Sequence, residues 1–323
     1  MIKTALTRMF DLRHPIVLGP MGGVAGGALA AAVSNAGGLG LVGGGYGDPD
    51  WLRTELAIVR RSTDASWGAG VITWAVGREL MQQILAEQPH AVMLSFGDPR
   101  PHGALVKAAG CKLICQVQDL AGALLAREAG ADLIVAQGTE AGGHGSARST
   151  LALVPAVVDA VAPVPVLAAG GIADGRGLAA ALMLGAQGAL VGTRFYASDE
   201  ALGSSRAKAC IANGSGEQTQ RTTVFDIVRG YSWPEPYTGR ALRNQFMARW
   251  HGREPALADA VSTESTRFKQ AQQEEDFETV MVWAGEATDL IQSIEPAGEI
   301  VQRISTDAER CLNAGAAMCR ADQ

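Results

Sequence analysis

Between residues 15 and 195 the chain repeats one unit: a short apolar run, a glycine or polar turn, and a stretch with helical spacing of apolar residues. The apolar runs lie at residues 15–18, 39–42, 68–73, 91–96, 112–117, 133–136, 165–169 and 189–192. Strands that are apolar throughout and alternate with helices form parallel sheets covered on both faces. Eight units, spaced by about 25 residues, favour an α/β fold of the (β/α)8 type, a TIM barrel. A doubly wound open sheet is the alternative.

The pattern stops after residue 195. Residues 198–293 are more polar and gather aromatic side chains, among them Trp233 and Trp250. Their apolar spacing predicts helices at 240–250, 263–273 and 277–290, and residues 296–318 predict a last helix that packs back on the barrel. We therefore expect a barrel of residues 1–200 and 295–323, with a mainly helical second domain, a substrate or lid domain, at 201–294 inserted before the last barrel helix.

Composition narrows the classes of function. With 47% hydrophobic and 19% charged residues the chain can bury a large core, and its net charge of -6 provides no general attraction for nucleic acid or an anionic membrane. We expect no membrane span, because prolines break residues 154–173, and no secretory signal in the first 14 residues. The five cysteines, Cys319 included, are predicted to be reduced and to hold no metal. These features predict a cytoplasmic protein.

Several motifs can be set aside. Residues 38–43 match G-x-G-x-x-G, but that motif needs a strand before it and a helix opening inside it, whereas here the glycines bracket a strand. The chain has no Walker A sequence, H-E-x-x-H pair or nucleophile-elbow serine. Phosphoryl transfer, zinc proteolysis and serine hydrolysis therefore have no support.

Glycine-rich loops follow the seventh and eighth predicted strands. Ala169, Gly170 and Gly171 end the seventh, and Gly192 and Thr193 end the eighth. In TIM barrels the backbone N–H groups of these two loops form a phosphate site, together with a nearby helix N-terminus. The pair of loops favours phosphate binding, although the glycines could also serve only to allow tight turns.

A histidine follows the sixth predicted strand. His144 lies after Gly143, at the barrel face where catalytic residues lie. Imidazole titrates near neutral pH, so it can take up a proton and return it. His144 is therefore the candidate catalytic residue, and a solvated loop histidine is the alternative.

Other polar or backbone groups end the strands at the same face. Pro20, Met21 and Gly22 end the first strand, and Thr73, Gln116 and Gln137 end the third, fifth and sixth. Amide side chains there could hydrogen-bond a planar heterocycle without adding charge. Alternatively the glutamines only cap the strand ends.

Several segments together resemble the nitronate monooxygenase family, formerly called 2-nitropropane dioxygenases. They are Gly19-Pro20-Met21 and residues 34–40, 138–144, 169–175, 191–195 and 282–286. The resemblance covers nearly the whole barrel. It implies an FMN cofactor with its phosphate on the loops at Gly170, Gly171, Gly192 and Thr193, its ring near Met21, Gly22, Gln116 and Gln137, and His144 as catalytic base. Pro20, Thr73, Gly143 and Ala169 complete the predicted cofactor site.

The resemblance implies FMN-dependent oxidation of alkyl nitronates, with nitroalkanes as further candidate substrates, by O2 to carbonyl compounds and nitrite. FMN-dependent enoyl-acyl-carrier-protein reductases and flavin NADH:quinone reductases share the motifs, so NAD(P)H-driven reduction of a quinone or enoyl thioester is one alternative. A non-flavin phosphate-binding barrel, such as an aldolase or a sugar-phosphate binder, is another. The expected partners are small molecules, with a homodimer as one possible assembly.

Overall fold

The computed structural model describes residues 1–318 and contains a ring of eight parallel strands. The strands are β1 (Ile16–Leu18), β2 (Gly40–Gly45), β3 (Trp67–Ile72), β4 (Ala91–Ser95), β5 (Lys112–Val117), β6 (Leu133–Gln137), β8 (Val166–Ala169) and β9 (Ala189–Val191), paired in the order β1-β9-β8-β6-β5-β4-β3-β2. The ends of this row meet, because the Leu18 amide donates to the Leu39 carbonyl and the Leu39 amide to the Ile16 carbonyl, both at 2.9 Å. The predicted TIM barrel is confirmed and the open sheet is excluded.

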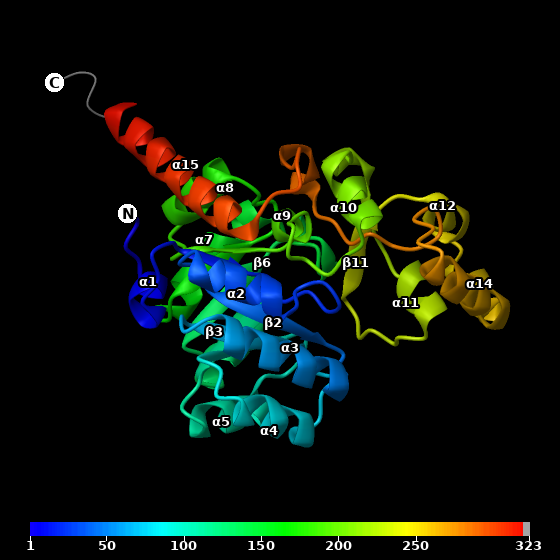
Figure 1. Cartoon of the computed structure of the whole chain (residues 1–323), viewed down its shortest axis with the longest axis horizontal. Coiled ribbons are helices and arrows are strands. Elements are labelled where there is room, and N and C mark those ends of the chain that lie inside the picture. Colours follow the sequence, from blue (N-terminus) through cyan, green and yellow to red (C-terminus); the bar gives the residue numbers. More distant parts are fainter. Residues whose placement is uncertain (319–323) are drawn as a thin grey trace.

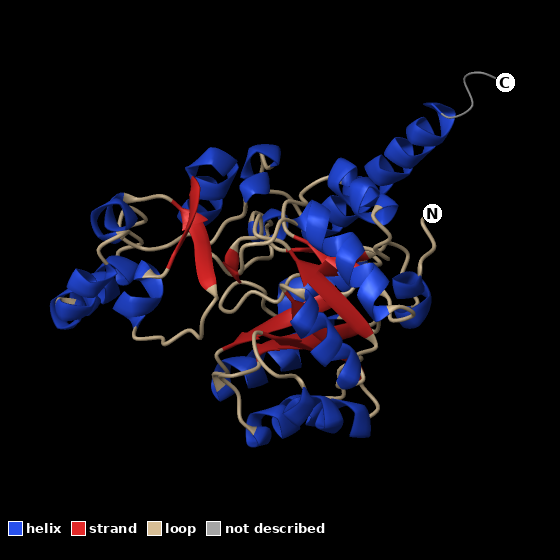
Figure 2. Cartoon of the chain, turned by 180° about the vertical axis from the view of Figure 1, so that it is seen from behind, coloured by secondary structure: helices blue, strands red, loops and turns tan. Residues whose placement is uncertain are grey.

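Helices surround this ring (Figures 1 and 2). They are α2 (Gly27–Asn35), α3 (Pro49–Ser62), α4 (Arg78–Ala86), α5 (Arg100–Ala108), α6 (Leu120–Glu128), α7 (Thr150–Val161), α8 (Gly175–Met183) and α15 (Ala297–Met318). Strand side chains alternate between two cores: Val92 and Leu94 pack outward against the helices, whereas Met93 points into the barrel. A short helix, α1 (Ala5–Phe10), packs on the interior core at the amino ends of the strands.

The predicted last helix is confirmed as α15, which packs against α8 and α2. Figure 1 shows it in red alongside α8, with its carboxyl end directed away from the barrel. The contact is so close that a Cβ at Gly175 would lie 2.4 Å from the Ala308 amide nitrogen, so only glycine fits there. Cys319 lies outside the described residues; Cys111, Cys115, Cys210 and Cys311 are free thiols, as expected.

The segment between β9 and α15 is mainly helical, with a hydrophobic core of its own. It contains α9 (Thr193–Tyr196), α10 (Ser205–Ala212), η1 (Gly216–Gln218), β10 (Thr219–Thr222), α11 (Val224–Arg229), β11 (Thr238–Leu242), α12 (Gln245–Trp250), α13 (Glu254–Asp259), α14 (Val261–Gln273) and η2 (Glu286–Leu290). The helix expected at 263–273 is confirmed as part of α14. The boundaries expected for a separate domain stay a prediction.

Two helix predictions in this segment are wrong. Residues 240–242 belong to strand β11, and the helix expected from 240 begins only at Gln245. Residues 277–285 form no helix, and only the short 3-10 helix η2 follows them. The apolar residues that produced the helical spacing face the same core, Ala241 from strand β11 and Val280 from a bend. Pairing with other strands outweighs local spacing here.

A second sheet links the inserted segment to the barrel. It is antiparallel, in the order β10-β11-β7, and β7 (Gly143–Gly145) comes from the loop that follows β6. His144 therefore lies in a short strand opposite Gly239, rather than in a free loop past a strand end. Figure 2 shows this sheet beside the barrel strands. Within residues 1–318, no helix has the length and apolarity needed to cross a bilayer.

Candidate active site

A cavity of about 520 Å³ lies at the carboxyl ends of the barrel strands. The inserted segment contributes Arg229, Tyr231 and Trp233 to its wall. The wall also includes twelve of the thirteen residues that the sequence predicted for the site: Pro20, Met21, Gly22, Gln116, Gln137, Gly143, His144, Ala169, Gly170, Gly171, Gly192 and Thr193. These residues come from the ends of five barrel strands, β1, β5, β6, β8 and β9, and from β7, and they meet around one space.

Thr73 is the exception and does not line the cavity. Strand β3 ends at Ile72, which is the residue of this pair that lies on the wall. The Thr73 side chain is buried against Gly97, and its hydroxyl has no hydrogen-bond partner among residues 1–318. The expectation fails because successive side chains of a strand point to opposite sides, and the last residue of the apolar run falls on the wrong side.

The glycine loops after β8 and β9 form a backbone cradle, defined here as Gly170, Gly171, Gly192 and Thr193. Gly170 and Gly171 have φ values of 101° and 73°, and a Cβ on Gly170 would lie 3.0 Å from the Gly138 carbonyl oxygen. Within residues 1–318, the amides of Gly171, Gly192 and Thr193 donate to no protein acceptor. Free amides beside a helix start at Thr193 suit a phosphate group. The cradle therefore has the free backbone donors that a phosphate group needs.

His144 is paired with a carboxylate that the sequence did not single out. Its Nε2 lies 3.0 Å and 2.9 Å from the two Oδ atoms of Asp226, on helix α11. The side chains are 9% and 3% exposed, respectively. Asp226 is 82 residues further along the chain, so no local motif joins the two. Only the fold brings them together.

Burial sets the charge state of this pair. Removal from water lowers the pKa of His144 below its ordinary value, and this effect outweighs the opposing influence of Asp226. The imidazole is therefore neutral near pH 7, and Nε2–H donates a hydrogen bond to Asp226 rather than forming an ion pair. In this tautomer the proton-accepting lone pair is on Nδ1. The arrangement can abstract a proton from a molecule in the cavity.

The glutamines do more than cap strand ends. The Gln137 Oε1 accepts hydrogen bonds from Gln116 Nε2 at 3.1 Å and from Gln118 Nε2 at 2.8 Å. The Gln137 Nε2 donates in turn to the His144 carbonyl at 3.1 Å. Gln118, buried one residue past the end of β5, is a further member that the sequence did not suggest. The network ties the ends of β5 and β6 to the strand that carries His144.

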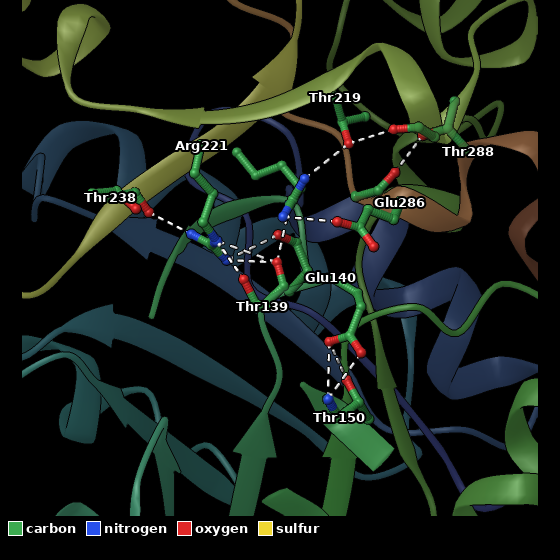
Figure 3. A network of polar contacts seen from close by, with 12 residues as sticks. Thr139, Glu140, Thr150, Thr219, Arg221, Thr238, Glu286 and Thr288 are labelled. Carbon is green, nitrogen blue, oxygen red and sulfur yellow. Dashed lines mark hydrogen bonds and ion pairs between the residues drawn. The ribbon is translucent and has the colours of Figure 1, made fainter. Parts of the chain in front are cut away.

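A network of two arginines, one buried and one half-buried, holds the loop before His144 (Figure 3). Arg221 donates to the carbonyls of Thr139, Ala141 and Thr238 at 3.0, 3.4 and 2.6 Å. Arg240 also donates to the Thr139 carbonyl and pairs with Glu286 at 2.8 Å. Burial, with the charge of Arg240 nearby, lowers the pKa of Arg221 to about 10, so its guanidinium stays charged at neutral pH.

Glu140 in the same loop caps a barrel helix. Its carboxylate accepts hydrogen bonds from the Thr150 amide and hydroxyl at 2.9 and 2.8 Å, at the start of α7. Figure 3 shows this contact below Arg221. The loop is therefore fastened at both sides, to the inserted sheet by Arg221 and to the barrel by Glu140.

A closed TIM barrel with an anion cradle after its last two strands and a neutral, carboxylate-paired histidine in the same cavity has the site of a barrel enzyme. A family model described as "Nitronate monooxygenase" matches residues 3–76 and 74–307. The chain therefore belongs to the nitronate monooxygenase family and is a flavin-dependent oxidoreductase.

Individual relatives agree with this assignment. A protein of Staphylococcus aureus (strain Newman) named "Probable nitronate monooxygenase" is 30% identical over 94% of this chain and 96% of its own length. Among solved structures, FabK from Thermotoga maritima has a TM-score of 0.88 and 31% identity, covering 98% of this chain and all of that one. Nitroalkane oxidase from Streptomyces ansochromogenes has a TM-score of 0.83 and 29% identity, covering 96% and 99%.

Proposed function

We propose that this protein binds FMN without a covalent bond and oxidises alkyl nitronates, and nitroalkanes after deprotonation, with O2 to carbonyl compounds and nitrite. The observation that carries the proposal is the hydrogen bond from His144 Nε2 to Asp226, which leaves Nδ1 as a base in the cavity. Similarity to a nitroalkane oxidase supports the same substrate class.

Two groups of cavity residues would bind different parts of the cofactor. The cradle of Gly170, Gly171, Gly192 and Thr193 would hold the phosphate, and Met21, Gly22, Gln116 and Gln137 would face the ring. FMN, when bound, supplies the electron acceptor and the reaction with oxygen. Both assignments rest on the cavity wall and the free backbone donors described above.

His144 accepts the substrate proton in the proposed reaction. A nitroalkane is a weak carbon acid, and Nδ1 of a neutral imidazole can accept the proton from the carbon that bears the nitro group. Asp226 then stabilises the imidazolium through Nε2–H. Among residues 1–318, Arg229 is the only lysine or arginine on the cavity wall. Its charge attracts the nitronate anion that deprotonation produces.

Replacing the base tests the assignment. In H144A loaded with FMN, we expect kcat/KM for a nitroalkane to fall by roughly 10²- to 10⁴-fold, the range that general-base catalysis contributes. A preformed nitronate has already lost its proton, so its turnover should fall much less. Oxygen uptake with each substrate measures both rates. Unchanged nitroalkane oxidation in H144A would show that His144 is not the base.

The second candidate is FMN-dependent reduction of a quinone or enoyl thioester by NAD(P)H. The glycine–histidine loop at 138–144 favours it, because that loop is shared with the enoyl reductases in the family resemblance. Anaerobic stopped-flow mixing separates the two: rapid bleaching of the flavin by NADH supports the reductase, and bleaching by a nitronate supports the oxidation. A colourless protein that cannot be loaded with FMN would contradict both.

A further inference from the structure

One aromatic side chain of the inserted segment lies directly on the catalytic histidine. The Trp233 ring is stacked on the His144 imidazole, with the ring centroids 3.5 Å apart and the planes at 5°. The indole thus covers one face of the imidazole. A substrate must reach Nδ1 from the ring edge, in a space that Trp233 bounds on one side.

Trp233 is held in this position from the barrel. Its Nε1–H donates to the Tyr46 hydroxyl at 2.8 Å. Tyr46 is itself stacked on Tyr231, with centroids 3.8 Å apart and planes at 3°. Around Trp233 the loop is exposed at Ser232 and at 234–236, so Trp233 turns inward from an otherwise solvated loop. The hydrogen bond and the stack together fix residues 231–233 against Tyr46.

The space left for a substrate is small. A cavity of about 520 Å³ is in the range that one drug-sized ligand occupies. FMN is a ligand of that size, so it would take most of the volume. What remains for a substrate is bounded in part by Trp233, which lines the cavity together with His144.

From these contacts we propose that Trp233 sets the upper size limit of the substrate and that Tyr46 is the positioning residue that holds it there. The inference rests on the proposed function and deepens it: the substrates are short-chain alkyl nitronates, and long or aromatic ones are excluded by the indole. The wall formed by a single large side chain is the kind that discriminates between substrates differing by a few methylene groups.

The test compares FMN-loaded wild type with Trp233→Ala for ethyl nitronate and hexyl nitronate. The ratio of kcat/KM for the hexyl over the ethyl compound should rise at least about 10-fold in W233A. Trp74→Ala is the matched control, because Trp74 contacts Trp233 edge-on with centroids 5.3 Å apart but does not line the cavity. Its ratio should stay at the wild-type value. An unchanged ratio in W233A overturns the proposal.

A binding measurement keeps this test separate from the proposed reaction. Carboxylates are planar anions of nitronate shape that do not react, so propionate and heptanoate can be titrated into the FMN-loaded protein and followed by the flavin spectrum. W233A should favour heptanoate at least about 10-fold more than wild type does. If this shift occurs but wild type oxidises no nitronate, the size limit stands and the proposed function fails. If the shift is absent, the size limit is wrong.

Tyr46→Phe provides a second variant should W233A fail to retain FMN. It removes the hydrogen bond to Trp233 and keeps the ring stacked on Tyr231. The size ratio should move in the same direction as in W233A, by roughly 3- to 10-fold, the effect of one lost hydrogen bond. A Y46F ratio equal to that of wild type would contradict the role of Tyr46.

Discussion

At the scale of single residues, the proposed chemistry depends on a histidine that is kept neutral by burial and oriented by one carboxylate. Burial alone would make His144 a weak base, because it lowers the pKa. Asp226 opposes this effect and fixes the tautomer through Nε2, so Nδ1 is the atom that would act as the base in the proposed reaction. In Ser-His-Asp triads a buried carboxylate likewise hydrogen-bonds the imidazole and fixes its tautomer.

Replacing Asp226 with asparagine should reduce kcat/KM for nitroalkanes by roughly 100-fold, since the imidazolium formed on deprotonation loses its counter-charge. The pH dependence of kcat/KM tests the action of Asp226 on His144 more directly than the size of the rate loss does. Only the neutral imidazole is active, so wild-type kcat/KM should be full above the lowered pKa of His144 and fall as pH drops through it. In D226N the influence that raises this pKa is gone, and the fall should move to still lower pH. Identical profiles would show that Asp226 does not act on His144.

At the scale of elements, two short pieces of backbone build the site. Strand β7 has only three residues, yet its pairing with β11 sets His144 opposite Gly239. A side chain at Gly239 would collide with the Trp283 ring at 2.5 Å. The cradle depends in the same way on Gly170, where a Cβ would lie 3.0 Å from neighbouring backbone atoms, and on the positive φ of Gly170 and Gly171.

The cradle can be tested with G170A. Its Cβ would lie 3.0 Å from two backbone atoms and from the Thr150 hydroxyl, so the loop must shift and the free amides move. We expect FMN to bind at least about 10-fold more weakly, a loss of about 1.4 kcal/mol. G130A is the control: Gly130 also has positive φ, 79°, but nothing lies within 4 Å of its Cβ position. Fluorescence titration of FMN measures both, and normal affinity in G170A would place the phosphate elsewhere.

At the scale of the whole molecule, the barrel is completed by a helix that is distant in the sequence. The chain leaves the barrel after β9, forms the inserted segment, and returns as α15 to pack on α8 and α2. Figure 1 shows this return. The inserted segment is therefore joined to the barrel through β7 at one end and through α15 at the other, which places Trp233 and Asp226 over the cavity.

If α15 is an integral barrel helix, truncating its buried face should destabilise the fold. Ile304 is 1% exposed in the core between helices and strands, so I304A should lower the free energy of unfolding by about 2–5 kcal/mol. Ile294, 38% exposed just before α15, is the control, and I294A should change it by less than about 0.5 kcal/mol. Urea unfolding followed by circular dichroism measures both. Equal stabilities would contradict this role of α15.

Much of the architecture was readable from sequence, because barrel strands and turns have local signatures. Continuous apolar runs marked the eight strands, glycines marked the loops after β8 and β9, and the position of His144 past β6 predicted its place at the catalytic face. The family resemblance predicted the enzyme class, which the family assignment confirms. These features could be predicted from the sequence because each depends on residues that are neighbours in the chain.

What the tertiary structure alone decided depends on contacts between residues far apart in sequence. The partner of His144 is Asp226, 82 residues away, and the stack on its ring comes from Trp233. The helix expected at 240–250 is partly strand, because β11 finds partners in β10 and β7. The spacing of apolar residues indicates which side chains are buried, but not which elements they pack against. The sequence by itself therefore determined the barrel and the place of His144, and the folded chain decided the tautomer, charge state and neighbours of its imidazole.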